Sequence, residues 1–298
     1  MNRELILKSS RRTRSQLHEA HAVSLANLHY NSAYYVAFAT GIKHQQRRLH
    51  RTELPIEPST WSEMLSQPHK AGFLAAVELE YSDLQEYSTF EAVPEAEAED
   101  FVIPTHWVFT YKFDDEGFLL KYKARLVVRG DLQPKQDEET YAATLAARIF
   151  RFLIALAAYF NLEAKQFDVI NAFTNAKIKK KIWVKFPPGK QRAGHILLLL
   201  RALYGLRVSL LLWYEHLCST MQQLGLKPVL ECACLFTNDR LIIFFYVNDI
   251  VVLFHPTHEQ AYLDFRDSLI AHFKLRGMGD LKWFLGIRIL RDRVHHKI

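Results

Sequence analysis

Apolar residues recur along the chain at two spacings, one typical of helices and the other typical of strands. The segments predicted as helices are 71–90, 144–161, 209–225 and 257–273. The segments predicted as strands or hairpins are 107–130, 233–254 and 279–290, with turns expected at 238–239 and 248–249. The segment 164–173 is predicted as a strand that runs into a helix. The order of these elements, with hairpins among them, predicts an α+β fold with an antiparallel sheet.

Residues 1–57 differ from the remainder, because basic clusters flank a tract of helical pattern at 15–40. His18 and His21 have a spacing found in some metal sites, but no third ligand accompanies them. We therefore interpret both as helix-surface residues. The prolines and the Ser/Thr residues of 55–61 place a helix start near residue 60. We predict an N-terminal segment of uncertain fold over 1–57 and a separate domain over 58–298.

Two polar residues, Asn248 and Asp249, interrupt the apolar segment 244–252, FFYVNDIVV. A buried carboxylate is costly unless it is paired or holds a cation. Asp168, in QFDVINAF, lies at the end of another apolar strand. If these strands are neighbours in one sheet, both carboxylates can hold Mg²⁺ or Mn²⁺, and two such ions would support phosphoryl transfer. Taken singly, each aspartate is better explained as a turn or cap residue.

Composition sets broad limits on the class of protein. The chain has 298 residues, 49 % of them hydrophobic, which supports a folded core, and its net charge of +6 is compatible with a polyanionic partner. Its three cysteines, Cys218, Cys232 and Cys234, argue against a disulfide scaffold. Cys232 and Cys234 are better explained as small strand residues than as half of a metal site. We find no apolar run of membrane-spanning length and no clear secretion signal, so we expect an intracellular protein, cytoplasmic or nuclear.

Seven segments, taken in their order and spacing, resemble the reverse transcriptase domain of copia-type retrotransposons, close to the fungal branch. They are WVFTYKFDDEGFLLKYKARLVVRGD (107–131), TYAATLAARIFRFLIALAA (140–158), QFDVINAF (166–173), PPG (187–189), LYGLR (203–207), FFYVNDIV (244–251) and GDLKWFLGI (279–287). The resemblance implies a right-hand polymerase palm and fingers, with a central antiparallel sheet and a largely missing thumb. It also implies an RNA-directed DNA polymerase that uses an RNA template, a DNA primer, deoxynucleotide triphosphates and Mg²⁺ or Mn²⁺.

The same resemblance implies roles for individual residues. Asp168 matches the first metal-binding aspartate of the palm. Phe173 matches the aromatic residue that selects deoxynucleotides, although a core aromatic would look the same. Lys123 and Arg125 match the hairpin that contacts the incoming triphosphate, although charges on an exposed hairpin are ordinary. Gly205 matches a turn that lets the template and the nucleotide approach the backbone, and a plain turn glycine is the alternative.

Three further residues, Trp283, Leu285 and Gly286, match the primer-grip hairpin, where sheet packing is an equally good explanation of the first two. All three lie in the segment WFLGI.

The chain departs from the family at its most informative motif. Family members have Tyr-Val-Asp-Asp where this chain has Tyr246, Val247, Asn248 and Asp249. The resemblance makes Tyr246 a further candidate for substrate binding. The resemblance implies that the first aspartate of the motif is shared by two metal ions, and an amide oxygen brings no negative charge. We expect this change to lower the rate by about 10³-fold or more. Asp249 cannot substitute, because adjacent residues of a strand point in different directions.

Other departures from the family are Leu210, the basic run 179–181 and Ala233. With no capsid, protease, integrase or RNase H segments recognised, we predict a degenerate fragment whose polymerase is inactive or strongly impaired. One alternative is a non-catalytic nucleic-acid-binding protein that uses the basic segments 11–14, 45–51 and 177–181, although each could be a solvated surface. Another is an open reading frame without a functional product. The sequence assigns no oligomeric state.

Overall fold

The computed structural model describes residues 48–134 and 139–298. The described residues form two compact units. The first contains 48–86, 106–127 and 187–189, and the second contains 87–105, 128–134, 139–186 and 190–298. The predicted helical tract at 15–40, with His18 and His21, lies outside the described residues. The predicted domain boundary at residue 57 stays a prediction.

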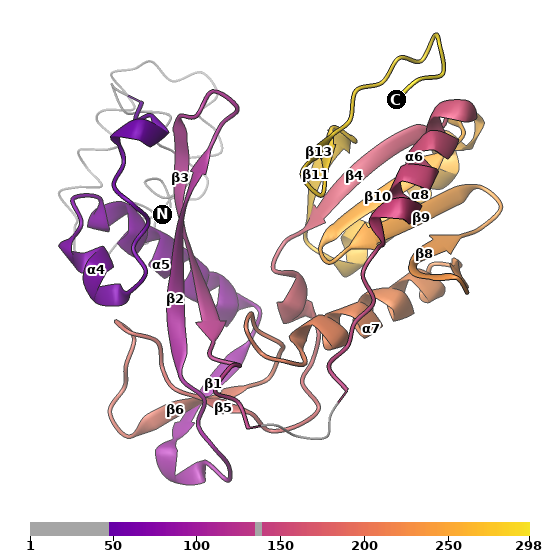
Figure 1. Cartoon of the computed structure of the whole chain (residues 1–298). Helices are drawn as coiled ribbons and strands as arrows, with labels where there is room; N and C mark the ends of the chain where they lie inside the picture. Colours follow the sequence, from indigo (N-terminus) through magenta and orange to yellow (C-terminus); the bar gives the residue numbers. More distant parts are fainter. Residues whose placement is uncertain (1–47, 135–138) are drawn as a thin grey trace, which may run out of the picture. The chain divides into compact units, whose positions relative to one another are not determined.

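Two helices and one β-hairpin make up most of the first unit (Figure 1). They are α4 (Trp61–Ser66), α5 (Lys70–Glu86), β2 (Thr105–Phe113) and β3 (Leu119–Val128), with the short 3₁₀ helix η2 (Arg51–Glu53) before them. The Thr60 side chain accepts a hydrogen bond from the backbone N–H of Glu63 at 3.2 Å, which confirms the predicted helix start. Phe73 of α5 packs against Phe109 and Tyr122 of the hairpin, with ring centroids 5.2 and 5.1 Å away.

A six-stranded antiparallel sheet forms the centre of the second unit (Figure 1), as the chain pattern predicted. Its strands, in spatial order, are β11 (Leu275–Asp280), β4 (Glu163–Val169), β10 (Asp249–Phe254), β9 (Leu241–Tyr246), β8 (Cys232–Thr237) and β7 (Lys227–Val229). Strands β4, β10 and β9 lie in the interior of the sheet, and β10 is buried over most of its length. This position explains why 249–254 has a continuous apolar run after its aspartate.

Helices lie on both faces of this sheet. They are α6 (Ala147–Tyr159), α7 (Ser209–Gln223) and α8 (Glu259–His272). Phe150 of α6 contacts Phe244, whereas Tyr214 of α7 contacts the next residue, Phe245. Because successive residues of a strand point to opposite faces, α6 covers one face and α7 covers the other. Helix α8 shares the α7 face, where Tyr262 stacks on Phe254 at 4.6 Å.

The remaining elements of the second unit are short. A three-stranded sheet has the order β1 (Phe90–Pro94), β6 (His195–Leu199) and β5 (Trp183–Val184), and a hairpin joins β12 (Trp283–Phe284) to β13 (Ile287–Arg288). The 3₁₀ helices are η3 (Glu95–Glu97), η4 (Ala172–Asn175) and η5 (Pro256–His258).

Two local expectations need correction. The predicted helix after β4 is only the 3₁₀ turn η4. The predicted turn at 248–249 lies one residue earlier, because Asp249 already pairs with Tyr246 and leaves Val247 and Asn248 as the turn. Among the described residues, no helix has the length and apolar character needed to cross a membrane.

Candidate active site

Four residues from four neighbouring strands form a row on one face of the central sheet. Tyr246 of β9 lies opposite Asp249 of β10, Asp249 lies opposite Asp168 of β4, and Asp168 lies opposite Arg276 of β11. Residues that are directly paired across strands point to the same face, with their Cβ atoms about 5 Å apart. The structure therefore confirms that the strands of Asp168 and Asp249 are neighbours, and it places Arg276 at the end of the same row.

A strained two-residue turn holds Asn248 beside this row. Val247 has a φ of 54°, a left-handed conformation that is unusual for a β-branched residue. The Trp213 indole N–H of α7 donates to the Val247 carbonyl at 2.8 Å, and the Val169 N–H of β4 donates to the Asn248 carbonyl at 2.9 Å. Such conformations persist when the surrounding structure fixes them, and they gather at functional sites. Here two hydrogen bonds from different elements fix the turn.

Both carboxylate oxygens of Asp168 have a donor beside them. The Asn248 amide nitrogen donates to Oδ1. The Arg276 guanidinium nitrogen Nη1 lies 3.5 Å from Oδ2. The Asp168 side chain is 21 % exposed, and that of Arg276 is 57 % exposed. The charge of Asp168 is thus offset by one cation and one amide.

Asp249 has a weaker set of partners. The Gln166 amide donates to its Oδ1 at 3.3 Å. Burial raises the pKa of Asp249, the negative charge of Asp168 raises it further, and the Gln166 hydrogen bond offsets part of this rise. The ionised pair therefore lacks positive charge on the Asp249 side, and a bound cation there would be stabilised.

The donor set determines how many divalent ions these residues can hold. Asp168 and Asp249 supply oxygen ligands of the kind that Mg²⁺ and Mn²⁺ prefer. In the part of the chain that the structure describes, there is no group of three or more His, Cys, Asp or Glu side chains placed to hold a metal ion. Asn248 has an amide where a third carboxylate would be needed, and its amide nitrogen donates a hydrogen bond to Asp168. The residues present fit one divalent ion and lack the third carboxylate that a pair of ions would require.

Phe173 and Gly205 contact other parts of the second unit. The Phe173 ring lies edge-on to Tyr204 with centroids 4.7 Å apart, and it packs against the main core. Gly205 has a φ of +88°. A Cβ atom added to Gly130 would lie 2.0 Å from the Gly205 carbonyl oxygen. The close backbone approach at Gly205 in this structure is therefore made by Gly130, and the proposed roles of both predicted residues stay predictions.

Lys123 and Arg125 belong to the first unit, whereas the carboxylate pair belongs to the second. Both are half-buried residues of β3. Lys123 lies in the electrostatic environment of Glu80 on α5. Burial lowers the pKa of Lys123 to about 8 and raises the pKa of Glu80 to about 7. Lys123 thus has a carboxyl neighbour within its own unit, and its contact with a triphosphate stays a prediction.

The predicted primer-grip residues lie on the β12–β13 hairpin. Trp283 is 52 % exposed, and Leu285 and Gly286 form the turn with φ values of 50° and 75°. The residue that packs into the core is Phe284, whose ring stacks on Phe150 at 4.8 Å. Trp283 therefore lies on the exposed surface of the hairpin. Phe284, which was not among the residues predicted from the sequence, anchors the hairpin to the core.

Arg276 lies at the site but was not among the residues predicted from the sequence. No local pattern marks it, because it lies in a polar, glycine-containing strand, and its position beside Asp168 comes from the pairing of β11 with β4. Its only sequence signal is a basic residue on the strand that follows the last long helix.

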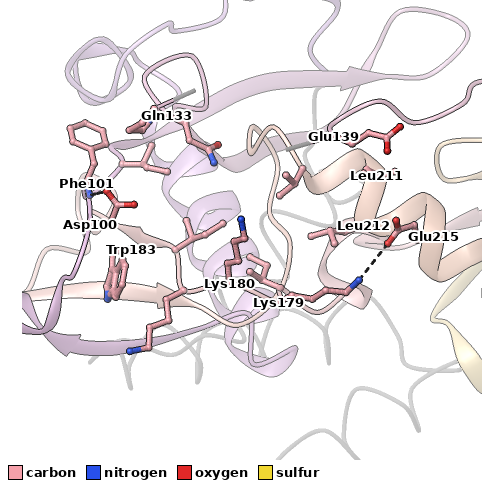
Figure 2. Close-up of a pocket in the computed structure, with 16 residues that line it drawn as sticks. Asp100, Phe101, Gln133, Glu139, Lys179, Lys180, Trp183, Leu211, Leu212 and Glu215 are labelled. Carbon is pink, nitrogen blue, oxygen red and sulfur yellow. Dashed lines mark hydrogen bonds and ion pairs between the residues drawn. The ribbon is translucent and has the colours of Figure 1, made fainter. Parts of the chain in front are cut away.

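A separate cavity of about 440 Å³ lies elsewhere in the second unit (Figure 2). Its walls include apolar side chains of α7 and the basic run at 179–181. Figure 2 shows the Lys179 side chain extended towards Glu215, with 3.9 Å between ammonium and carboxylate. Lys181 forms an ion pair with Glu99. Two charges of the basic run are therefore offset within the protein, which weakens the case for this run as a phosphate-binding surface.

The antiparallel sheet, with two aspartates paired across neighbouring strands beside a hairpin turn, matches the arrangement that the sequence motifs predicted. The chain belongs to the reverse transcriptase (RNA-dependent DNA polymerase) family, whose model matches residues 87–298.

The relatives of the chain are polyproteins of copia-type transposons. It is 29 % identical over 252 residues to the retrovirus-related Pol polyprotein from transposon TNT 1-94 of Nicotiana tabacum. The matched region covers 81 % of this chain and 19 % of that protein. The chain is 29 % identical over 212 residues to the Pol polyprotein from transposon RE2 of Arabidopsis thaliana (68 % and 14 %). It is 30 % identical over 154 residues to the transposon Ty1-DR4 Gag-Pol polyprotein of Saccharomyces cerevisiae (51 % and 9 %). The chain thus spans less than a fifth of these relatives, and the similar identities to plant and yeast elements do not favour the fungal branch.

Proposed function

We propose that this chain is the RNA-directed DNA polymerase domain of a copia-type retrotransposon and that its polymerase activity is strongly impaired. The observation that carries the proposal is the cross-strand pair of Asp168 and Asp249, with an amide donated to Asp168 from the third position of the Tyr-Val-Asp-Asp motif. The second unit then corresponds to the palm, and the first unit, with its hairpin, corresponds to the fingers. RNA template, DNA primer and deoxynucleotide triphosphates are the proposed partners.

Asp168 and Asp249 are the proposed ligands of Mg²⁺ or Mn²⁺. A bound ion supplies a Lewis acid for phosphoryl transfer. Phe173 is the proposed gate against a 2′-hydroxyl group, and Lys123 with Arg125 is the proposed contact for the triphosphate. The exposed Trp283 is the proposed contact for the primer.

The proposed impairment follows from charge. Carboxylates at both Asp168 and Asp249 provide two negative charges, and Arg276 offsets one of them. An aspartate in place of Asn248 would restore a third carboxylate at the turn. This carboxylate would lie beside Oδ1 of Asp168, which now accepts the Asn248 amide, and could bind a cation there. Each factor of ten in rate corresponds to about 1.4 kcal/mol of activation free energy, so a 10³-fold decrease corresponds to about 4 kcal/mol. We attribute a loss of about this size to the missing charge.

The test is primer extension on poly(rA) with an oligo(dT) primer and Mg²⁺ or Mn²⁺, comparing the unaltered chain with Asn248→Asp. Asn238→Asp is the matched control, because Asn238 lies in the neighbouring β8–β9 turn and accepts hydrogen bonds from the N–H groups of Arg240 and Leu241, which an aspartate can also accept. Adding Asp249→Asn to Asn248→Asp should abolish any restored activity.

We expect extension only from Asn248→Asp. If neither Asn248→Asp nor the unaltered chain extends the primer, the polymerase proposal fails for this chain, and salt-dependent nucleic-acid binding without Mg²⁺ dependence becomes the function to measure. If the unaltered chain extends as fast as Asn248→Asp, the polymerase proposal holds and the proposed impairment is wrong.

A further inference from the structure

Arg276 lies beside Asp168 because of the backbone pairing, and its side chain does not need to reach across the sheet. Strand β11 is the edge strand of the central sheet, and its pairing with β4 sets Arg276 directly opposite Asp168. The guanidinium nitrogen Nη1 lies 3.5 Å from the carboxylate oxygen Oδ2. A cross-strand pair of opposite charge is favourable. Register therefore holds a permanent cation next to the carboxylate proposed to bind metal.

Arg276 and a divalent ion would use the same oxygen. Oδ1 of Asp168 already accepts the Asn248 amide, and Oδ2 is the oxygen that faces Arg276. An ion bound to Asp168 through Oδ2 would lie close to the guanidinium, and the repulsion between two positive charges a few ångströms apart is strong in a partly buried site. Binding of an ion at Oδ2 therefore requires Arg276 to move away.

The structure leaves Arg276 room to move. Its side chain is 57 % exposed, whereas that of Asp168 is only 21 % exposed. Gly277 follows it directly, and a Cβ atom added there would meet nothing within 4 Å. The pair is thus one that a competing cation can open at modest cost, because half-exposed ion pairs contribute about 1 kcal/mol or less.

We propose that Arg276 is a built-in counter-cation of Asp168 that competes with divalent metal ions for this carboxylate. The inference rests on the proposed metal-dependent function and adds a second cause of weak metal binding besides Asn248. The cluster of Asp168, Asp249 and Arg276 carries one net negative charge. Arg276→Gln and Asn248→Asp each raise this to two negative charges, by different routes, and the double variant raises it to three.

The experiment measures Mn²⁺ binding to the purified full-length chain by electron paramagnetic resonance of free Mn²⁺, at low ionic strength and without nucleic acid. The variants are Arg276→Gln, Arg276→Lys, Asn248→Asp and the double variant Asn248→Asp/Arg276→Gln. Arg240→Gln is the matched control, because it removes the same charge at the opposite end of β9 from Tyr246.

We expect Arg276→Gln to tighten Mn²⁺ binding about three- to tenfold, both in the unaltered chain and in the Asn248→Asp variant, because the competing cation is gone. Arg276→Lys keeps the charge and should bind Mn²⁺ nearly as weakly as the unaltered chain. Arg240→Gln should leave the affinity unchanged.

Three outcomes would overturn the inference in different ways. If Asn248→Asp binds Mn²⁺ and the added Arg276→Gln change does not tighten it, Arg276 is no competitor, and the proposed polymerase site survives. If none of these proteins binds Mn²⁺, the proposed metal site fails and the role of Arg276 fails with it. An equal gain in Arg240→Gln would show an effect of overall charge and would also exclude a specific role for Arg276.

Discussion

Glu80 offers a sharp test of the electrostatics of the first unit. It lies on α5 beside Lys123 and Arg125 of β3, and a backbone hydrogen bond from Leu126 also lowers its pKa. Burial outweighs these favourable contacts and raises the pKa from its ordinary value of 4.5 to about 7. The perturbation is Glu80→Gln, which removes the ionisable group and keeps a side chain of similar size.

The magnitude follows from the two pKa values. The unfolded chain releases this proton near pH 4.5, whereas the folded chain holds it until about pH 7. The folded state therefore binds more protons in this window, and its stability decreases as the pH rises from 4.5 to 7. One pKa unit corresponds to about 1.4 kcal/mol. Ionisation of Glu80 therefore lowers the free energy of unfolding by about 3 kcal/mol as the pH rises from below 4.5 to above 7.

Lys123 acts in a higher pH range and with the opposite slope. Burial, with the nearby charge of Arg125, lowers its pKa from 10.5 to about 8. The folded state binds fewer protons between these two values, so this residue makes the stability increase as the pH rises from about 8 to 10.5. The contribution of the pair to stability is therefore smallest between pH 7 and 8.

The assay is amide hydrogen exchange in α5 and β3, because the two compact units need not unfold together and a single global transition would mix them. The measured quantity is the free energy of opening of α5 and β3. As the pH rises from 5 to 8, we expect this free energy to decrease by about 2–3 kcal/mol more in the unaltered chain than in Glu80→Gln. Glu78→Gln, at an exposed position of the same helix, should run parallel to the unaltered chain. Parallel profiles for Glu80→Gln as well would refute the buried-carboxyl reasoning.

Two further predictions concern the second unit. Gly130→Ala should destabilise the chain by about 1–3 kcal/mol in thermal unfolding, because its Cβ would overlap the Gly205 carbonyl. As the control, the added Cβ of Gly277→Ala meets no atom within 4 Å, so the stability should change by less than about 0.5 kcal/mol. Similar losses in both variants would contradict the close contact at Gly130. Trp213→Phe leaves the Val247 carbonyl without its indole donor and should lower hydrogen-exchange protection in the β9–β10 turn by about 1–3 kcal/mol. Unchanged protection there would mean that the indole does not hold the strained turn.

The sequence by itself determined most of the elements of the described fold. Helices α5, α6, α7 and α8 and the β2–β3 hairpin lie close to the predicted segments, because hydrophobic periodicity is a local property that each segment carries alone. The motif order also determined the family. The sequence could predict that Asp168 and Asp249 lie close together only on the condition that their strands are neighbours in the sheet.

Only the tertiary structure decided which side chains face one another. The register of β11 against β4 brought Arg276 to Asp168, and the β9–β10 turn directed the Asn248 amide to the same carboxylate. The fold also showed that Phe284, and not Trp283, anchors the terminal hairpin. These contacts depend on pairing between distant strands, and a one-residue change of register would turn every side chain to the other face. Local pattern contains no information about that choice, which is why the cation beside Asp168 emerged from the structure alone.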